Sequence, residues 1–299
     1  MNISASQVKE LREKTGVGMM ECKKALEENA GDLEKSILWL RERGMSRAAK
    51  KADRVAAEGL VEVLVNEDAN AGVVLEVNCE TDFVSKNDDF KKLTKDLAAI
   101  CLKKQINDVD VLAQEKLESG KTVSETISQL IQTIGENMKL RRVGYFSTTN
   151  GCIAGYVHMG GKIGSLIVLE GQKSPETIHL AKDIAMHIAA ANPRYLSNES
   201  VKKDELLQER ELERKKLLEE KKPEAMIEKI LEGKMRKFYQ EVCLLDQVFV
   251  KDPDTTIANL VKKAGANLKA TAFARFQLGE GIEKKSEDFA AEVAAQLKN

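Results

Sequence analysis

The chain has 299 residues, of which 32% are charged and 42% are hydrophobic, a balance typical of a soluble globular protein with two or three folding units. The net charge of -1 and the 4% aromatic content give no support for nucleic acid as the main partner, since phosphate binding needs a basic excess and base stacking needs aromatic rings. No apolar run approaches the ~20 residues that span a bilayer. The first residues also lack a secretion signal, so we expect no membrane contact and a cytoplasmic location.

The N-terminal segment, up to about residue 50, predicts three short helices. Gly16 and Gly18 separate the first from the second, which runs from about Met19 to Glu28, and Asp32 is placed to cap the third. Three helices of this length have a marginal core of their own. Such a module usually serves for docking.

Two stretches of the chain follow the same order of elements. β-Branched runs at 60–65 and 73–77 predict a hairpin, and apolar residues at helical spacing follow it. Runs at 153–158 and 163–169 predict a second hairpin, again followed by a helix. Between them we expect a helix from 123 to 138 and a strand at 142–146. We interpret the pattern as a weak internal duplication of two α+β subdomains.

The stretch from 199 to 237 is more than half charged, with thin apolar stripes on either side of Pro223. This pattern predicts an antiparallel helical hairpin that projects from the body. It fits a solvated surface arm as well as a dimer or partner contact, and both interpretations stay open.

The C-terminal part predicts short elements that alternate. The apolar runs and turn residues place strands at 242–245 and 248–250, a turn at 252–254, a helix at 257–264, a strand at 272–277 and a terminal helix at 287–297. The terminal helix carries Phe289, Val293 and Leu297 on one face, which can dock in cis or on a partner.

Catalytic and metal-binding patterns are missing from the sequence. Its five cysteines are scattered singly, which indicates reduced, buried thiols and neither disulfides nor a zinc site. His179 and His187 lie eight residues apart, too far for a metal pair on one helix, and structural roles are favoured for both. Cys79 has Glu80 and Asp82 as neighbours but no histidine to act as its base. We therefore expect no enzyme, no metal and no cofactor.

The segment from Thr81 to Val84 is the best candidate for a contact with another protein. Thr81 is placed to cap a short helix after a strand, and Asp82 then lies in the first turn, where its charge suits the helix dipole. Phe83 follows directly. The pattern alone allows an exposed apolar wedge, but it favours Phe83 and Val84 packed in the subdomain core.

Several long motifs resemble bacterial elongation factor Ts. Residues 11–26 resemble the N-terminal signature of that family, and residues 76–84 resemble its second signature. The match continues to the end of the chain and keeps the same order, through residues 135–137, 141–142, 184–187 and 279–283.

The resemblance implies a nucleotide exchange factor for elongation factor Tu, the GTPase that delivers aminoacyl-tRNA to the ribosome. It implies an α+β fold with a three-helix, ubiquitin-associated-like docking module at 1–54 and core subdomains at 55–142 and 143–280. A helical-hairpin arm would be inserted in the second subdomain at about 197–237, and a C-terminal helical module would occupy 281–299. The arm permits a homodimer or a 2:2 complex.

The resemblance also assigns contact residues. Phe83 would be a wedge that enters the GTPase near its magnesium site, with Asp82 as its polar partner between Thr81 and Val84; this favours an exposed Phe83. Further contacts would come from Arg12, Met19, Met20, Lys23, Ile134, Gly135, His158 and Leu231. A scaffold or chaperone that binds the GTPase without exchange is the alternative, and the near-neutral charge argues against an RNA-binding protein.

Overall fold

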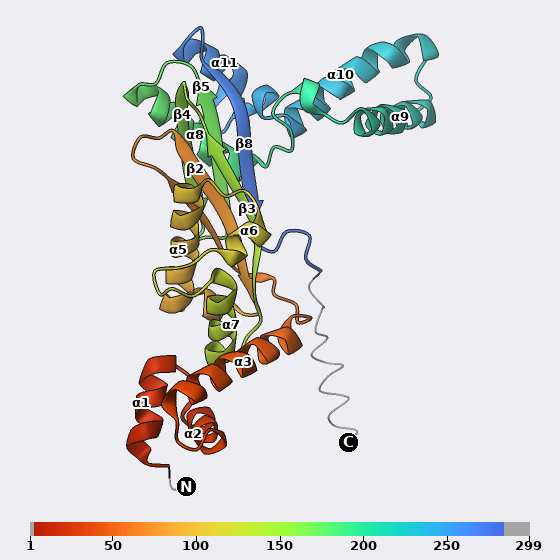
Figure 1. Ribbon diagram of the computed structural model, residues 1–299. Coiled ribbons are helices and arrows are strands. Elements are labelled where there is room, and N and C mark those ends of the chain that lie inside the picture. The colour runs from red at the N-terminus through yellow and green to blue at the C-terminus, as the bar shows by residue number, and fades with distance from the viewer. Residues whose placement is uncertain (1–2, 284–299) are drawn as a thin grey trace.

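The computed structural model describes residues 3–283, and its fold is α+β, as predicted. The molecule is elongated, with a bundle of three helices at one end, a body that contains two three-stranded antiparallel sheets, and two long helices that project sideways from the opposite end of the body (Figure 1). The terminal helix predicted at 287–297 lies outside the described residues. Within residues 3–283, none of the helices combines the length and the apolar character needed to cross a membrane.

The N-terminal bundle consists of α1 (Ala5–Thr15), α2 (Met19–Glu28) and α3 (Leu33–Lys51), which confirms the three predicted helices. Ser4 and the side chain of Gln7 form a capping box at the start of α1. The helices enclose a small apolar core of their own, made of Val8, Leu11, Val17, Cys22, Ala25, Leu26 and Leu40.

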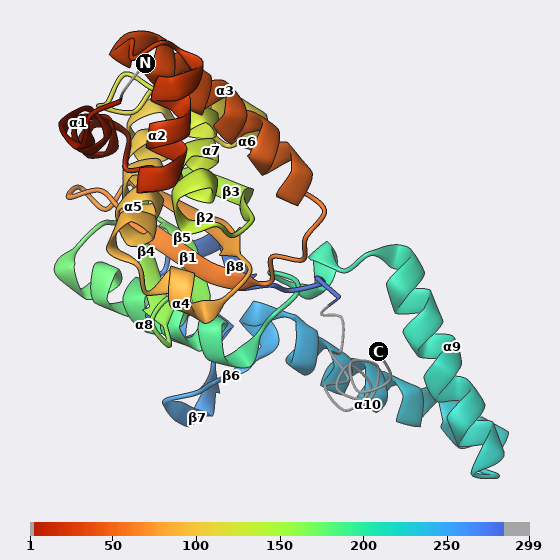
Figure 2. The same ribbon diagram turned by 90° about the horizontal axis from the view of Figure 1, so that it is seen from below.

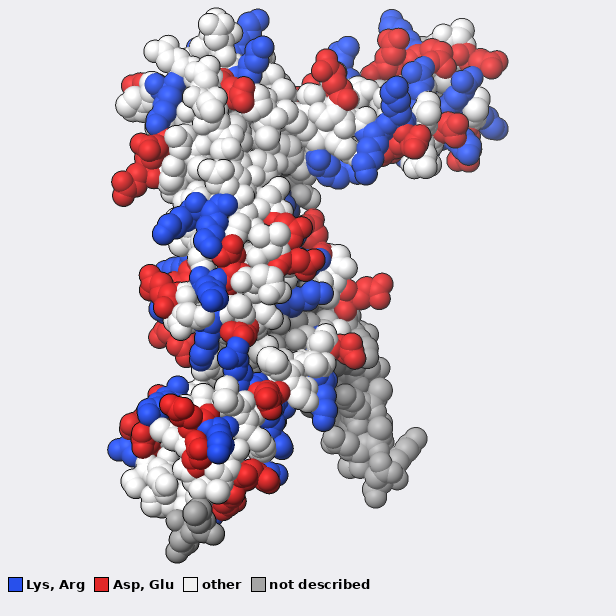
Figure 3. Space-filling model, in the orientation of Figure 1, with Lys and Arg blue, Asp and Glu red and all other residues white. Residues whose placement is uncertain are grey.

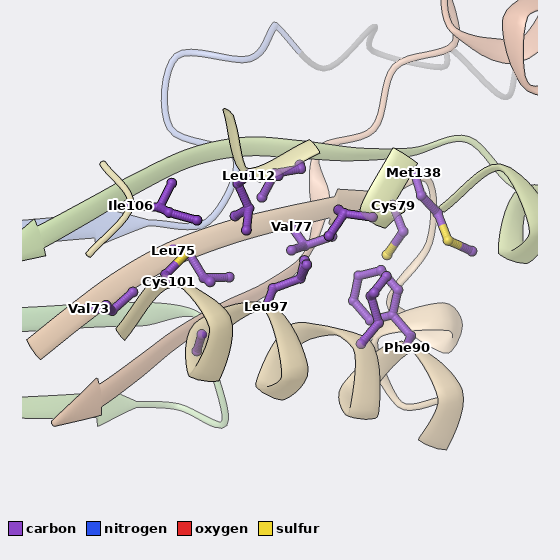
Figure 4. Close-up of a cluster of buried hydrophobic side chains, with 14 of the residues drawn as sticks. Val73, Leu75, Val77, Cys79, Phe90, Leu97, Cys101, Ile106, Leu112 and Met138 are labelled. Carbon is purple, nitrogen blue, oxygen red and sulfur yellow. The ribbon is translucent and has the colours of Figure 1, made fainter. Parts of the chain in front are cut away.

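The first sheet contains β1 (Glu58–Val65), β2 (Ala71–Cys79) and β3 (Met138–Ser147), with β2 in the centre. Helix α5 (Asp88–Lys104) covers one face of this sheet. Alternate side chains of a strand point to opposite faces. Figure 4 accordingly shows every second residue of β2 directed at α5, where Val73, Leu75, Val77 and Cys79 meet Phe90, Leu97 and Cys101.

Three shorter helices surround the first sheet: α4 (Asp82–Ser85), α6 (Val109–Gln114) and α7 (Val123–Ile134). Helix α7 connects the body to the N-terminal bundle, because its Gln129 amide donates a 3.0 Å hydrogen bond to the carbonyl oxygen of Thr15. Helix α6 was not predicted, since its six residues are too short for a clear apolar period.

The second sheet contains β4 (Gly151–His158), β5 (Ile163–Glu170) and β8 (Lys269–Gln277), with β5 in the centre. Helix α8 (Pro175–Ala191) packs on its outer face, and α11 (Ile257–Ala264) lies beside α8 and β8. Both predicted hairpins and the helices that follow them are therefore present.

The two sheets pack against each other, so that α5 and α8 form the outer layers of the body. Gly164 makes a close approach possible, because a Cβ atom there would lie only 2.5 Å from Cγ1 of Val61 on the facing sheet. The backbone amide of Val61 also donates a 2.8 Å hydrogen bond to the carbonyl oxygen of Gly161. The two sheets are thus joined by polar as well as apolar contacts.

The lateral arm consists of α9 (Lys203–Glu219) and α10 (Glu224–Val242), which run side by side away from the body (Figure 2). Figure 3 shows that basic and acidic side chains interleave densely over the visible face of the arm. A narrow apolar seam made of Leu217, Ile227 and Leu231 joins the two helices.

The arm leaves and re-enters the body at one place. The backbone amides of Arg194 and Tyr195, before the arm, both donate to the carbonyl oxygen of Val242 at its end, over 2.8 and 3.0 Å. Glu205 in the first turns of α9 pairs with Arg194 over 2.5 Å and accepts a hydrogen bond from the Tyr195 hydroxyl. The base of the arm is therefore clasped to the body.

Two expectations for the C-terminal part were wrong. The strand expected at 242–245 is absent, because Val242 still belongs to α10 and residues Leu244–Asp246 form a 3-10 turn. The turn expected at 252–254 lies inside β7 (Asp252–Thr256), which pairs with β6 (Val248–Phe249). The register between these strands is irregular, and such a bulge accommodates the proline at 253 that a regular ladder would exclude.

Candidate partner-binding site

The segment 81–84, called the tip below, lies directly after the end of β2. There the chain leaves the sheet, and α4 forms a single helical turn in which the Ser85 hydroxyl donates a 2.7 Å hydrogen bond to the carbonyl oxygen of Asp82. Asn87 then caps α5 through hydrogen bonds from the amides of Asp89 and Phe90. Two rigid elements, a central strand and a long helix, thus fix both ends of the tip.

Phe83 and Val84 point in opposite directions. The side chain of Val84 is buried among the core residues between α5 and the first sheet, whereas Phe83 is 78% exposed. The Lys86 ammonium lies 5.6 Å from the centre of the Phe83 ring and 2.7 Å from the Asp82 carboxylate. The tip therefore presents a large aromatic side chain beside an ion pair.

Thr81 occupies the N-cap position of α4, as predicted, but its side chain makes no capping hydrogen bond to that helix. Its hydroxyl donates to Oε1 of Glu136 over 2.7 Å, and its backbone amide donates to Oε2 of the same carboxylate over 2.9 Å. Hydrogen bonds to an ionised carboxylate are about twice as strong as neutral ones, so this pair outcompetes a local cap. Thr81 consequently ties the tip to the loop that follows α7.

Cys79 has no features of a nucleophile. Burial raises the pKa of its thiol to about 12, and nearby Glu136 and Glu58 add to the effect. Its Sγ lies 3.1 Å from the carbonyl oxygen of Thr81, as a donor. A thiol that stays protonated at neutral pH does not attack a substrate. Among the residues that the structure describes, no cluster of histidine, cysteine or carboxylate side chains could hold a metal ion.

The residues expected to make contacts on the N-terminal bundle lie on its surface. Met19 and Met20 begin α2, and their side chains are 42% and 76% exposed. Arg12 and Lys23 are also exposed, on α1 and α2. Methionine side chains are flexible and polarizable, which suits an adaptable apolar contact.

His158 lies at the same end of the body as the tip. It is exposed at the end of β4, with Nδ1 3.2 Å from the Tyr156 hydroxyl. Lys162, in the same turn, pairs with Glu58 over 2.7 Å, and Glu58 is the register partner of Cys79 at the end of β2. The turn that carries His158 and the tip are therefore neighbours.

The remaining expected residues differ in their surroundings. Ile134 ends α7 half-buried and Gly135 follows it exposed, next to the Glu136 that holds Thr81. Leu231, in contrast, is only 1% exposed inside the apolar seam of the arm. Hydrogen bonds and ion pairs thus gather the tip, residues 134–135 and the turn that carries His158 at one end of the body. Leu231 belongs to α10, which projects from the opposite end of the body (Figure 1).

A buried polar cluster behind the tip was not predicted from the sequence. Oε1 of the fully buried Glu76 accepts hydrogen bonds from Arg141, Asn78 and the backbone amide of Gly279, and Oε2 accepts one from Arg142 over 2.6 Å. Burial alone would raise the pKa of Glu76, but these donors outweigh it and hold the pKa below its ordinary value. A lone carboxylate within an apolar strand was the available signal.

Comparison with known proteins identifies the family. A family model described as elongation factor TS matches residues 80–280. The chain is 49% identical to an elongation factor Ts of Halothermothrix orenii over 299 residues, which cover 99% of each chain. It is 51% identical to an elongation factor Ts of Clostridium acetobutylicum over 301 residues, covering 99% of this chain and 98% of the other. With these matches along nearly its whole length, the chain belongs to the elongation factor Ts family.

Proposed function

We propose that this protein is a guanine-nucleotide exchange factor that binds the GDP form of elongation factor Tu during translation elongation in the cytoplasm. By disturbing the magnesium site of the GTPase it promotes GDP release, so that GTP can bind. It performs no covalent chemistry and holds no cofactor. The observation that carries the proposal is the exposed Phe83 on a rigidly anchored turn, in a chain of the elongation factor Ts family.

The wedge mechanism needs little direct contact with the nucleotide. Magnesium bridges the phosphates of a bound nucleotide and is held by few protein groups. An aromatic side chain pushed against a neighbouring segment displaces those groups, and the nucleotide loses much of its hold. Phe83 supplies the apolar surface, and Asp82 supplies a charge that can pair with a cation of the GTPase once Lys86 is displaced.

Linkage determines how strong the effect has to be. If the factor binds the empty GTPase more tightly than the GDP form, GDP weakens the binding of the factor by the same ratio. A ratio of ~10⁴ corresponds to about 5.5 kcal/mol of coupling free energy. One aromatic wedge does not provide all of it, so additional contacts must hold the factor in place.

We assign these additional contacts to exposed residues of the bundle and of the body and to the half-buried Ile134; the exposed ones are Arg12, Met19, Met20, Lys23, Gly135 and His158. In this arrangement residues 1–54 dock on the GTPase, and the two subdomains at 55–142 and 143–280 present the tip and the His158 turn. The arm provides a dimer contact, either of the protein alone or of a 2:2 complex. Because Leu231 is buried within the arm, it supports that contact by shaping the arm surface.

The test is GDP release from elongation factor Tu, followed by stopped-flow fluorescence with and without this protein. We expect acceleration by the wild-type protein and a loss of about thirtyfold with Phe83→Ala, equivalent to the ~2 kcal/mol of an interface hot spot. Only roughly a fifth of Phe83 is buried. Since full burial of such a side chain is worth ~1.5–3 kcal/mol, stability should fall by less than ~0.6 kcal/mol.

Val111→Ala is the matched control, because Val111 is also exposed, at 53%, but lies on α6 outside the proposed contacts. Its exchange rate should equal that of the wild type. Binding of the GTPase with an unchanged GDP release rate would instead show the alternative function, a scaffold or chaperone without exchange activity.

A further inference from the structure

The tip is held through polar contacts upstream of Phe83. The exposed ring lies next to Lys86, another surface side chain, so the ring's own packing does little to fix its direction. The backbone before it is held by the two hydrogen bonds that Thr81 donates to the Glu136 carboxylate, at 2.7 and 2.9 Å. Both oxygens of one carboxylate therefore restrain a single residue, two positions before the aromatic ring.

A second connection lies beside the first, and here the loop after α7 supplies the donor and the residue before the tip the acceptor. The backbone amide of Asn137 donates to Oε1 of Glu80 over 2.5 Å. Thr81 in the tip and Glu80 directly before it thus interlock with Glu136 and Asn137 from the loop after α7. The paired exchange of donors and acceptors prevents either segment from sliding along the other.

The interlock extends to the end of the N-terminal bundle. The side-chain amide of Asn137 donates to the carbonyl oxygens of Arg54 and Ala52, over 2.8 and 3.4 Å. The Lys51 ammonium, at the end of α3, donates to the carbonyl oxygen of Gly135. The three-residue loop 135–137 therefore touches both the tip and the connection that carries the bundle.

We propose that Glu136 is a positioning residue that holds Phe83 in its binding direction, and that Glu80 and Asn137 make this direction depend on the placement of the N-terminal bundle. The inference rests on the proposed function. Glu136 acts through Thr81 on the tip and needs no contact with the GTPase itself. When the bundle is docked, the interlock presents the ring without a further ordering cost, because a preorganised side chain loses little conformational freedom on binding.

Exchange kinetics separate this role from simple docking. In Glu136→Ala the bundle and the His158 turn still bind, so the factor concentration for half-maximal exchange should stay within about twofold of the wild type. The maximal GDP release rate should fall about tenfold, because the wedge is less well aligned. Glu136→Gln keeps one acceptor oxygen for Thr81 and should recover part of that loss. Glu67→Ala, on the exposed turn between β1 and β2, is the matched control.

A double-mutant cycle tests whether Glu136 acts through the ring. In the Phe83→Ala background, Glu136→Ala should cause no further loss, because the group that it positions is gone. An equal loss in both backgrounds, or no loss in the wild-type background, would overturn the proposal. Thermal melts of each variant exclude global unfolding as the cause.

Hydrogen exchange of the free protein tests the interlock independently of GDP release. Peptides that cover residues 80–86 should exchange about tenfold faster in Glu136→Ala than in the wild type, whereas peptides from α5 should be unchanged. Unchanged protection of 80–86 would refute the positioning role. Failure of the wild-type protein to accelerate GDP release would refute the proposed function instead, so the two results remain distinct.

Discussion

Glu76→Gln should be among the most destabilising single substitutions in the body. The change keeps the shape of the side chain but removes its charge. It also replaces one acceptor oxygen by an NH2 donor, which then faces other donors: either Arg142 or the groups that bind Oε1. Breaking a buried ion pair by removing one partner costs ~3–5 kcal/mol. Arg141 and Arg142 keep side-chain exposures of 23% and 29%, which favours the lower end, about 3 kcal/mol.

Urea unfolding of both proteins at pH 7 measures this difference as a change in the free energy of unfolding. Glu280→Gln is the control, because Glu280 also pairs with Arg142, over 3.3 Å, but its side chain is 47% exposed. A partner exposed to that extent contributes less than ~1 kcal/mol. A loss below ~1 kcal/mol for Glu76→Gln would refute the reasoning, since it would mean that the buried charge adds nothing to stability.

The pH dependence provides a second check on the same variant. The folded-state pKa of Glu76 lies below its ordinary value of 4.5. The unfolded chain therefore takes up the proton first, and the stabilisation by the charge is fully present above the unfolded-state pKa. It declines as the pH falls from there through the folded-state pKa. The difference in the free energy of unfolding between wild type and Glu76→Gln should accordingly be constant near neutral pH and shrink in acid. A difference that grows in acid would contradict the assignment.

Two further substitutions test other parts of the structure. Gly164→Ala should destabilise the body by ~1–3 kcal/mol, because the added methyl would meet Val61 and Val63 across the sheet interface. Chemical unfolding measures this loss of stability. An unchanged unfolding midpoint would contradict the prediction and show that the sheets can move apart. Leu231→Ala should loosen the arm and leave the body intact, since its neighbours Leu217 and Ile227 belong to the arm. A protease should cut the variant within α9 or α10 faster than it cuts the wild type. Slower or equal cleavage there would contradict the prediction.

The elements with a strong apolar period were predictable from the sequence. Phe90, Leu93 and Leu97 repeat at helical spacing and are all buried on α5. The charge-rich stretch on both sides of Pro223 forms the two helices of the arm. In these segments the local pattern and the tertiary packing agree, so the sequence contains enough information.

The errors fall where distant contacts override local preference. Thr81 has the sequence context of a helix cap, but Glu136, 55 residues away, takes its hydroxyl. Val242 continues a helix because its neighbours Phe238 and Met235 pack with it at the base of the arm. The opposite orientations of Phe83 and Val84 could not be derived from the residues alone, because both types occur in cores and in interfaces. The cluster around Glu76 joins three chain segments whose proximity only the fold reveals.

Because the chain enters and leaves the arm at one place, the arm is an insertion that can be removed without breaking the body. Since the amides of Arg194 and Tyr195 bond to the carbonyl oxygen of Val242, the two chain ends already lie side by side at the surface of the body. A short turn can therefore replace the long excursion without rerouting any strand of either sheet. Loop-closure entropy rises only slowly with length, so we expect the body to tolerate arms of different length at that junction. Under the proposed dimer role of the arm, its replacement by a turn would change the assembly state and leave in place the separate surface that carries Phe83.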